Sequence, residues 1–487
     1  MLNWIILGIA CAVLIYLGVR SSRIASDDDE AGFLIAGKTL GPFVGACTLI
    51  ATAFSGLCFM GSPGVSYPYG TIEILANFFF APAAVIAILF FASFLRKRAD
   101  AMGSYTIPEY VAQRHGKDDF GRLLQGTAAL ITIILLLVFL TSQIKAVGLL
   151  CSSWLGISLN TAALLMIVLI IVYTMLGGLA AVALTDTVMI IGMMAATVYV
   201  MVHIFSDVSV TEMISRLNEI DPQLVNPDTA KPYGNFKSAA FLILPYAFLF
   251  AAVLPYMAIR FLAFKPDVKF HTVAMYAAPF GCILSLIPIV GLYVRISAPA
   301  LETADKAMPY YLSNFLPPAI AGLITLCILF AMKSTANSLL HTVSSAVSYD
   351  LRNAFYHGKK FSPKKALAIN RIAVAVLGLT GFMMMIFAPP FFLSWLGILG
   401  TGTLLASMIG PVFISTFWQG NGYGAMASML GGFFVSGSML LFSDAGWVVG
   451  PLTGSLVGVT LYFVVSSVTF GIQPRTQLKT VKAVKAA

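Results

Sequence analysis

The sequence predicts an all-α integral membrane protein, and three observations support that fold class. Of its 487 residues, 59% are hydrophobic and only 10% are charged, whereas a soluble globular protein carries about 25% charged residues. The apolar residues form runs long enough to cross a bilayer as helices, which takes roughly 20 residues each. The ten-residue alternation of polar and apolar residues that marks an outer-membrane barrel is absent. A soluble enzyme is therefore excluded.

Thirteen apolar runs follow one another along the chain, and we expect each to span the membrane once. They lie near 3–20, 42–70, 72–95, 122–150, 160–178, 183–205, 238–259, 271–296, 316–348, 371–389, 391–418, 422–442 and 449–471. An odd number of spans places the two termini on opposite sides. The longest hydrophilic segment, 206–237, is too short for a catalytic domain and is expected to be an external cap or gate.

The basic residues predict which side is cytoplasmic. Of the 29 lysines and arginines, 22 fall in loops on one side, including Arg260, Lys265 and Lys269 after the seventh run, and five fall on the other. Because basic loops stay in the cytoplasm, the N-terminus is predicted outside and the C-terminus inside a plasma (inner) membrane. The net charge of +9 then indicates topology and contact with anionic lipid, and no nucleic-acid partner.

The second run is interrupted in a way that predicts a binding site. It contains Gly56, Gly61, Pro63 and Gly64, which release backbone groups that lipid cannot satisfy. Such breaks are tolerated where they line a polar cavity, and broken helices indicate the binding site of a transporter. No nucleotide-binding loop of the GxxxxGK[ST] type occurs, so an ATP-driven motor is not expected.

Four further segments, together with the second run, carry a resemblance to a known family. They read YTMLGGLAAVALTDT at 173–187, PYMAIRF at 255–261, AMKSTANSLLHT at 331–342 and WLGILGTGTLLASMIGPVFISTFW at 395–418. In this order they resemble the sodium/solute symporter family, which includes bacterial proline, pantothenate and sialic acid symporters. The resemblance implies sodium-coupled import of a small polar solute by alternating access, with no enzymatic activity and with Na⁺ as the coupling ion in place of any cofactor.

The resemblance also implies the leucine-transporter fold, in which two inverted repeats of five helices follow one extra helix and precede two accessory helices. The expected parts are 1–41 (extra N-terminal helix and cytoplasmic loop), 42–205 (first repeat), 206–237 (external loop), 238–418 (second repeat) and 419–487 (accessory helices and basic tail).

A sodium ion inside a membrane needs about five oxygen ligands, which a broken helix and neighbouring hydroxyls can supply. The resemblance assigns this role to the carbonyls of Ala51, Phe54 and Ala331 and to the hydroxyls of Ser334 and Thr335. The spacing of the last three residues places them on one helical face.

A second sodium site, found in some members of the family, would use Asp186 together with Ser334, Asn337 and Ser338. Lys333 and Met189 depart from the family pattern there. A lysine inside a span is costly and marks a functional site. Paired with Asp186, Lys333 could replace the cation, and the alternative is then a proton-coupled or sodium-independent carrier of the same fold.

The resemblance assigns the substrate site to Ser55, Cys58, Asn77, Tyr246 and Phe250. We also expect Lys145 either to extend to the outer interface or to hold a substrate carboxylate, which would make the solute an organic anion or an amino acid. Glu73 is expected at the interface.

Two rivals from other classes remain open at the level of sequence. A transporter-like solute sensor would need a signalling domain, and about 16 residues follow the last run. A membrane enzyme would need a metal cluster or a nucleophile and base, which the five scattered histidines do not supply. The expected partners are the solute and the lipid bilayer, and a monomer is expected to suffice.

Overall fold

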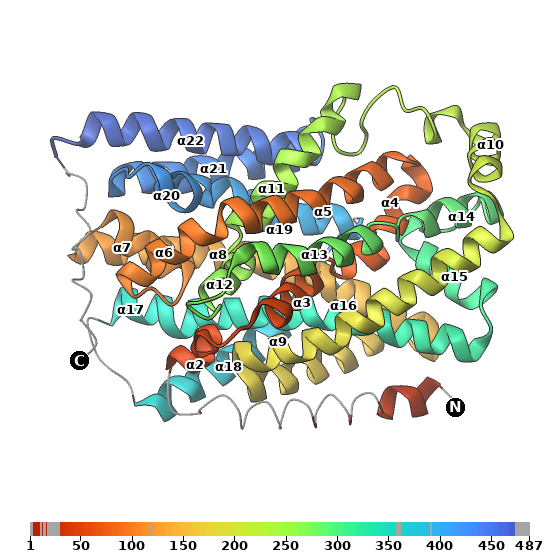
Figure 1. Cartoon of the computed structure of the whole chain (residues 1–487), viewed down its shortest axis with the longest axis horizontal. Coiled ribbons are helices and arrows are strands. Elements are labelled where there is room, and N and C mark those ends of the chain that lie inside the picture. Colours follow the sequence, from red (N-terminus) through yellow and green to blue (C-terminus); the bar gives the residue numbers. More distant parts are fainter. Residues whose placement is uncertain are drawn as a thin grey trace.

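A computed structural model of the chain describes residues 3–9, 12, 16, 30–116, 118–356, 362–389 and 392–472. The described chain is a bundle of helices, most of which run along its long axis (Figure 1). The longer helices are α5 (Ile72–Phe90), α8 (Asp118–Leu155), α9 (Leu159–Asp207), α13 (Phe270–Leu284), α16 (Pro318–Ser345), α18 (Pro363–Phe387), α19 (Leu393–Met408), α21 (Gly422–Phe442) and α22 (Val449–Thr469).

Shorter helices connect or extend these elements. They are α2 (Glu30–Ile35), α6 (Ala92–Met102), α7 (Ile107–His115), α10 (Val210–Ile220), α14 (Ile289–Ser297), α15 (Ala307–Phe315), α17 (Arg352–Phe355) and α20 (Ser415–Phe417). Two π-helical segments, η6 (Ala346–Leu351) and η7 (Ile409–Ile414), continue α16 and α19.

The number of spans differs from the expected thirteen. Nine helices of the described residues are long and apolar enough to cross a membrane, or up to eleven if each bent pair counts as one span. Half of the first predicted run, 3–20, lies outside the described residues, and the predicted runs 160–178 and 183–205 both fall within α9. The count of thirteen is therefore not confirmed.

Two spans are broken near their middle. The first comprises α3 (Pro42–Ala53) followed by the π-helical turn η2 (Leu57–Gly61) and α4 (Ser62–Tyr69), with a bend of 44°. The second comprises α11 (Ile243–Val253) and α12 (Pro255–Leu262), with a bend of 54°. Its helix stops at Leu254, which has φ −63° and ψ 127°, because a residue before proline is pushed into the extended region. The predicted break in the second run is confirmed.

The two broken spans are joined at one end. Leu40, just before α3, exchanges backbone hydrogen bonds with the segment after α12, from its N–H to Ala263 O (3.1 Å) and from the Lys265 N–H to its own carbonyl (3.0 Å). The inner halves α3 and α12 are thereby held beside each other, which brings both breaks to the same region of the bundle.

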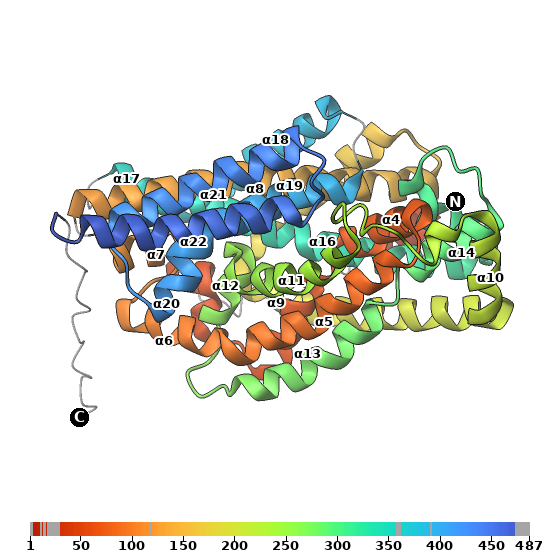
Figure 2. The ribbon, with the colours of Figure 1, turned by 90° about the horizontal axis from the view of Figure 1, so that it is seen from above.

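The helices that line this region are the most enclosed of the bundle. In the span Leu393–Phe417, 78% of the most apolar window is buried, against 28% for Val449–Thr469. The peripheral α21 approaches α19 closely at Gly432, which has no side chain. A Cβ on Gly432 would lie 2.1 Å from the Ala406 carbonyl oxygen. Such close contacts are usual where small residues join membrane helices. Helices α8, α16 and α19 thus form a core around the breaks, while α21 and α22 cover one side (Figure 2).

The first and last described segments lie at opposite ends of the bundle. Asn3 donates a hydrogen bond to the Trp154 carbonyl (2.7 Å) at the end that carries α10. Tyr462 in α22 bonds to His115 of α7 (2.6 Å) at the other end.

Candidate functional site

The break in the first span is stabilised from a neighbouring helix. Phe54 leaves the helical region with ψ 80°, and the freed amide of Gly56 donates to Gln143 Oε1 of α8 (3.1 Å). Because a side-chain acceptor serves the freed N–H, the chain can remain non-helical inside the bundle. The carbonyls near the break, including those of Ala51 and Phe54, lie at the end of α3.

Helix α16 presents hydroxyls to this break. Thr335 Oγ1 donates to the carbonyl of Thr52 (3.2 Å), one residue after Ala51. Ala331, Ser334 and Thr335 are all fully buried, as are Ala51 and Phe54. The five residues assigned to the first sodium site thus belong to two packed elements, α3 and α16, that meet at the broken segment.

A buried arginine occupies the region of the expected second sodium site. Arg260, in the last turn of α12, is 1% exposed. Its Nη2 donates to Thr52 Oγ1 (2.6 Å) and Ser338 Oγ (2.5 Å) and lies 3.9 Å from Asp186 Oδ2. Thr48 completes the cluster, because it accepts from Arg260 Nε (3.1 Å) and donates to Asp186 Oδ2 (2.6 Å).

Arg260 was expected in a cytoplasmic loop, and that expectation is wrong. The arginine is the sixth residue of the PYMAIRF segment, whose other residues are apolar apart from a tyrosine, so its place inside an apolar run was the available signal. Counting basic residues by side assigns every arginine near a run end to a loop, because the method does not consider an internal carboxylate partner such as Asp186.

Asn337 and Lys333 both face α9. The side-chain Oδ1 of Asn337 accepts from Thr174 Oγ1 (2.7 Å). The Nζ of Lys333 lies 3.3 Å from the centroid of the Tyr173 ring, a cation–π arrangement. Lys333 also interacts electrostatically with Asp186. Lys333 is thus near Asp186 as expected, but the ion pair that Asp186 forms among the described residues is with Arg260, at 3.9 Å.

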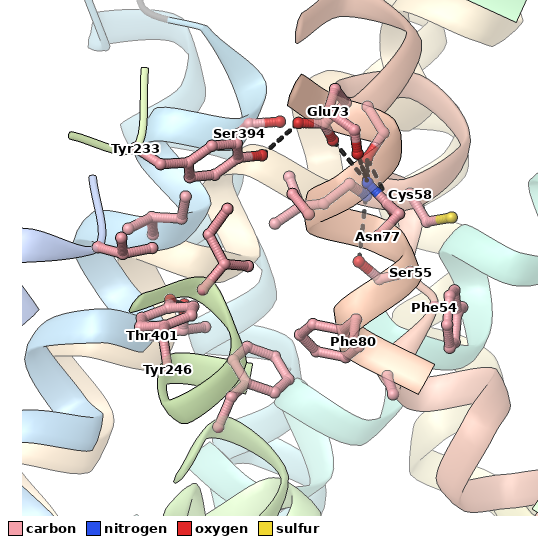
Figure 3. A pocket seen from close by; sticks show the side chains of 18 of the residues that line it. Phe54, Ser55, Cys58, Glu73, Asn77, Phe80, Tyr233, Tyr246, Ser394 and Thr401 are labelled. Atoms are coloured by element: carbon pink, nitrogen blue, oxygen red, sulfur yellow. Dashed lines mark hydrogen bonds between the residues drawn. The ribbon is translucent and has the colours of Figure 1, made fainter. Parts of the chain in front are cut away.

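A pocket lies between the first break and helices α5, α11 and α19 (Figure 3). Its volume is about 110 Å³, enough for several water molecules because one needs roughly 10–15 Å³ on such a measure. It is lined by five of the six residues expected to bind substrate: Ser55, Cys58, Asn77, Tyr246 and Phe250. Phe80 packs edge-on against Phe54 and Phe250, so aromatic rings form one wall.

The end of the pocket at Glu73 is polar. Glu73 Oε1 accepts from Asn77 Nδ2 (2.7 Å), and Oε2 accepts from the hydroxyl of Tyr233. Asn77 also donates to Ser62 Oγ (3.1 Å). Figure 3 shows Tyr233 reaching Glu73 across the pocket.

Two of these polar residues were missed from the sequence. Glu73 was expected at the interface, yet it is 2% exposed, and Tyr233 belongs to the 206–237 segment that was expected only to cap the site. The Tyr233 contact depends on the folding of that segment over the bundle, which no local pattern predicts.

Lys145 is not among the residues that line the pocket. It is half-buried on α8 and interacts electrostatically with Asp305. Asp305 Oδ2 accepts from the backbone N–H of Leu393 at the start of α19 (3.2 Å). Burial raises the pKa of Asp305 to about 6, while the Lys145 ammonium acts in the opposite direction. Lys145 thus takes part in a contact between α8, the α14–α15 connection and α19.

A bundle of apolar helices in which two broken spans enclose a polar pocket has the architecture of a secondary transporter. The chain belongs to the sodium:solute symporter family, whose profile matches residues 33–432. It is a sodium-coupled importer of a small solute, a multi-pass membrane protein and not an enzyme.

Relatives and solved structures agree with this assignment. The chain is 27% identical to the sodium/pantothenate symporter of Haemophilus influenzae, over 85% of this chain and 84% of that one. It is 26% identical to the osmoregulated proline transporter OpuE of Bacillus subtilis, over 88% and 86%.

The solved structures show the fold. A sodium-coupled sialic acid symporter in a substrate-bound, outward-open state matches with a TM-score of 0.78 at 17% identity, over 98% of this chain and 99% of that one. The nucleobase-cation-symport-1 transporter Mhp1, in a closed conformation, matches with a TM-score of 0.62 at 16% identity, over 93% and 98%. The leucine-transporter fold implied by the sequence is confirmed.

Proposed function

We propose that the solute binds in the pocket beside the first broken span and that the coupling sodium binds between α3 and α16. The observation that supports this most strongly is the Thr335 hydroxyl on the carbonyl of Thr52, next to a break whose other side opens into the pocket. Sodium would be held by Ala51, Phe54, Ala331, Ser334 and Thr335. Bound there, the ion would join α16 to the broken span and so link its own binding to the shape of the pocket.

The solute-binding residues in this proposal are Ser55, Cys58, Asn77, Tyr246 and Phe250, to which we add Glu73. Lys145 is assigned to the contact with Asp305 instead. Among the relatives, one is named for pantothenate and another for proline, and the enclosed volume suits a compact polar solute of this kind.

We infer that the two repeats comprise 42–205 and 238–418. Each would then begin with a broken span, α3–α4 and α11–α12, which supports an internal symmetry. The N-terminus is proposed outside and the C-terminus in the cytoplasm, supported by the excess of basic residues and by the opposite positions of residues 3–9 and α22. One chain supplies all proposed ligands, so a monomer suffices.

Uptake by the purified protein in liposomes tests this function. Labelled proline and labelled pantothenate serve as probes, with an inward sodium gradient compared with an equal potassium gradient. We expect sodium to drive accumulation of at least one probe, and Asn77→Ala to weaken that uptake. Ser345→Ala is the matched control, because among the described residues this buried hydroxyl of α16 bonds to the His341 carbonyl (2.7 Å) of its own helix. Equal uptake in both gradients would contradict the proposal.

A further inference from the structure

The charge of the proposed pocket is set by Glu73. This residue lies in the first turn of α5, where the positive end of the helix dipole favours a negative charge. Both of its carboxyl oxygens accept hydrogen bonds, from Asn77 and from Tyr233. The Asn77 amide N–H can only donate, which favours an acceptor oxygen at Glu73, and the Tyr233 hydroxyl is able to donate to the carboxylate when it is ionised.

Among the described residues, no protein cation pairs with this carboxylate. The residues that line the pocket include no lysine, arginine or histidine. Within the described ranges, none of the ion pairs involves Glu73. A buried charge is costly unless it is paired, and an acidic residue inside a span marks a binding or transport function. A cationic group that enters the pocket would supply the positive charge that the lining lacks.

The wall opposite the carboxylate is aromatic. Tyr246 lies at the other side of the cavity from Glu73 (Figure 3), its ring centroid is 6.4 Å from that of Phe250, and Phe80 packs against Phe250 with ring centroids 5.0 Å apart. Such a wall accepts the apolar body of a solute, while the Glu73 end accepts a hydrogen-bond donor. An anionic group would meet Glu73 without any basic side chain of the lining to stabilise it.

We propose that the transported solute carries a protonated amine, which pairs with Glu73 when the solute is bound. This assignment rests on the proposed function, because it takes the pocket as the solute site. Asn77 and Tyr233 orient the carboxylate, and the amine supplies the charge that the lining lacks. The solute class is thus a small amine, cationic or zwitterionic, and simple carboxylates are excluded.

Matched pairs of solutes test the amine directly. Sodium-dependent uptake of each labelled compound is measured in liposomes of the full-length protein, because symport of one sodium ion with a carboxylate anion moves no net charge and evokes no current. Alanine is compared with lactate, serine with glycerate, and valine with its 2-hydroxy acid, because each pair differs only in amine against hydroxyl. Proline, choline, ethanolamine, pantothenate and glucose complete the panel. We expect sodium-dependent uptake only of amine-bearing compounds.

Glu73→Gln separates charge from shape in the same assay. It should raise the half-saturating concentration of the responding amine by about 10- to 100-fold, the range for losing a hydrogen bond to a charged group. Glu73→Asp keeps the charge and should lose less. Glu219→Gln is the matched control, since this carboxylate is exposed on α10 outside the pocket.

The outcomes distinguish this inference from the function on which it rests. Sodium-dependent uptake of hydroxy acids, pantothenate or glucose equal to that of amines would overturn the amine assignment and leave the pocket as a sodium-driven solute site. Unchanged affinity for an amine in a well-folded Glu73→Gln would overturn it too. If no compound of the panel shows sodium-dependent uptake in the wild type, the proposed function itself fails.

Discussion

The guanidinium of Arg260 places a fixed positive charge beside Asp186, Thr52 and Ser338. These groups include two of the ligands, Asp186 and Ser338, that a second sodium ion would use. Because Nη2 already donates to Ser338 and Thr52, a second sodium would have to displace a charged, hydrogen-bonded side chain. Two like charges 4 Å apart repel by about 4 kcal/mol at an effective dielectric constant of 20.

One sodium ion per transport cycle is therefore expected. A sodium titration of solute-evoked current should give a Hill coefficient of about one, since a single site leaves no cooperativity between ions. The measurement uses saturating solute and replaces sodium with choline or potassium at constant ionic strength, whichever is not itself transported. A Hill coefficient near two would contradict this assignment and return Asp186, Asn337 and Ser338 to the role of sodium ligands.

Lys333 is held against Tyr173 and not among the proposed ligands of the first sodium ion. We expect Lys333→Met to leave the half-saturating sodium concentration within about threefold of the wild type, while loss of the cation–π contact lowers stability by about 0.5–2 kcal/mol. Sodium titration and thermal unfolding of the purified variant measure the two effects, and Tyr173→Phe, which keeps the ring, is the control. If sodium stimulates transport only in the methionine variant, the lysine replaces the cation after all.

At the scale of elements, the break of the first span requires a residue without a side chain at Gly56. A Cβ there would lie 2.7 Å from Gln143 Oε1 and 2.7 Å from Met332 Cγ. Gly56→Ala should thus push α8 and α16 away from the break and lower sodium-driven uptake at least tenfold. Gly41→Ala is the control, because a Cβ at that position meets nothing within 4 Å. Normal uptake by a well-expressed Gly56→Ala protein would show that the break tolerates displacement.

The sequence predicted the elements around the site unevenly, for physical reasons. The glycines and proline of the second run expose the break, because such residues are tolerated in a span where freed backbone groups find partners. Five of six substrate residues line one pocket because they lie on elements named by the resemblance. The sequence did not predict where Arg260, Glu73 and Tyr233 lie, because their positions depend on partners distant in the chain. Arg260 is paired with Asp186, and Glu73 is hydrogen-bonded to Tyr233.

At the scale of the whole molecule, hydropathy predicted the fold class and most span positions, while the number of spans is not confirmed. Long runs of apolar residues are a local property, and they coincide with the long helices. Whether neighbouring runs form separate spans depends on the geometry between them: 160–178 and 183–205 both fall within α9, whose apolar parts are Leu159–Met175 and Val182–Asp207. The proposed orientation rests on the distribution of basic residues between the two sides. Arg114, like Arg260, is buried, and it donates to the Ser415 carbonyl (2.7 Å). The excess of basic residues on one side remains large when these two arginines are left out.

The proposed orientation can be checked with single cysteines in a cysteine-free background. An impermeant maleimide should label Glu219→Cys on α10 in intact cells, because this segment is expected outside. Arg122→Cys, at the start of α8, should react only after permeabilisation. Reversed labelling would place the basic loops outside and contradict the topology.

The binding of sodium between α3 and α16 is the central claim, and it can be measured without knowing the solute. Saturable binding of radioactive sodium to the purified protein is followed by scintillation proximity, with unlabelled sodium or potassium as competitor. The wild type and Ser345→Ala should bind sodium and release it to unlabelled sodium but not to potassium. Ser334→Ala combined with Thr335→Ala should weaken binding at least tenfold, since it removes both hydroxyl ligands. Sodium binding by the double variant equal to that of the wild type would contradict the account.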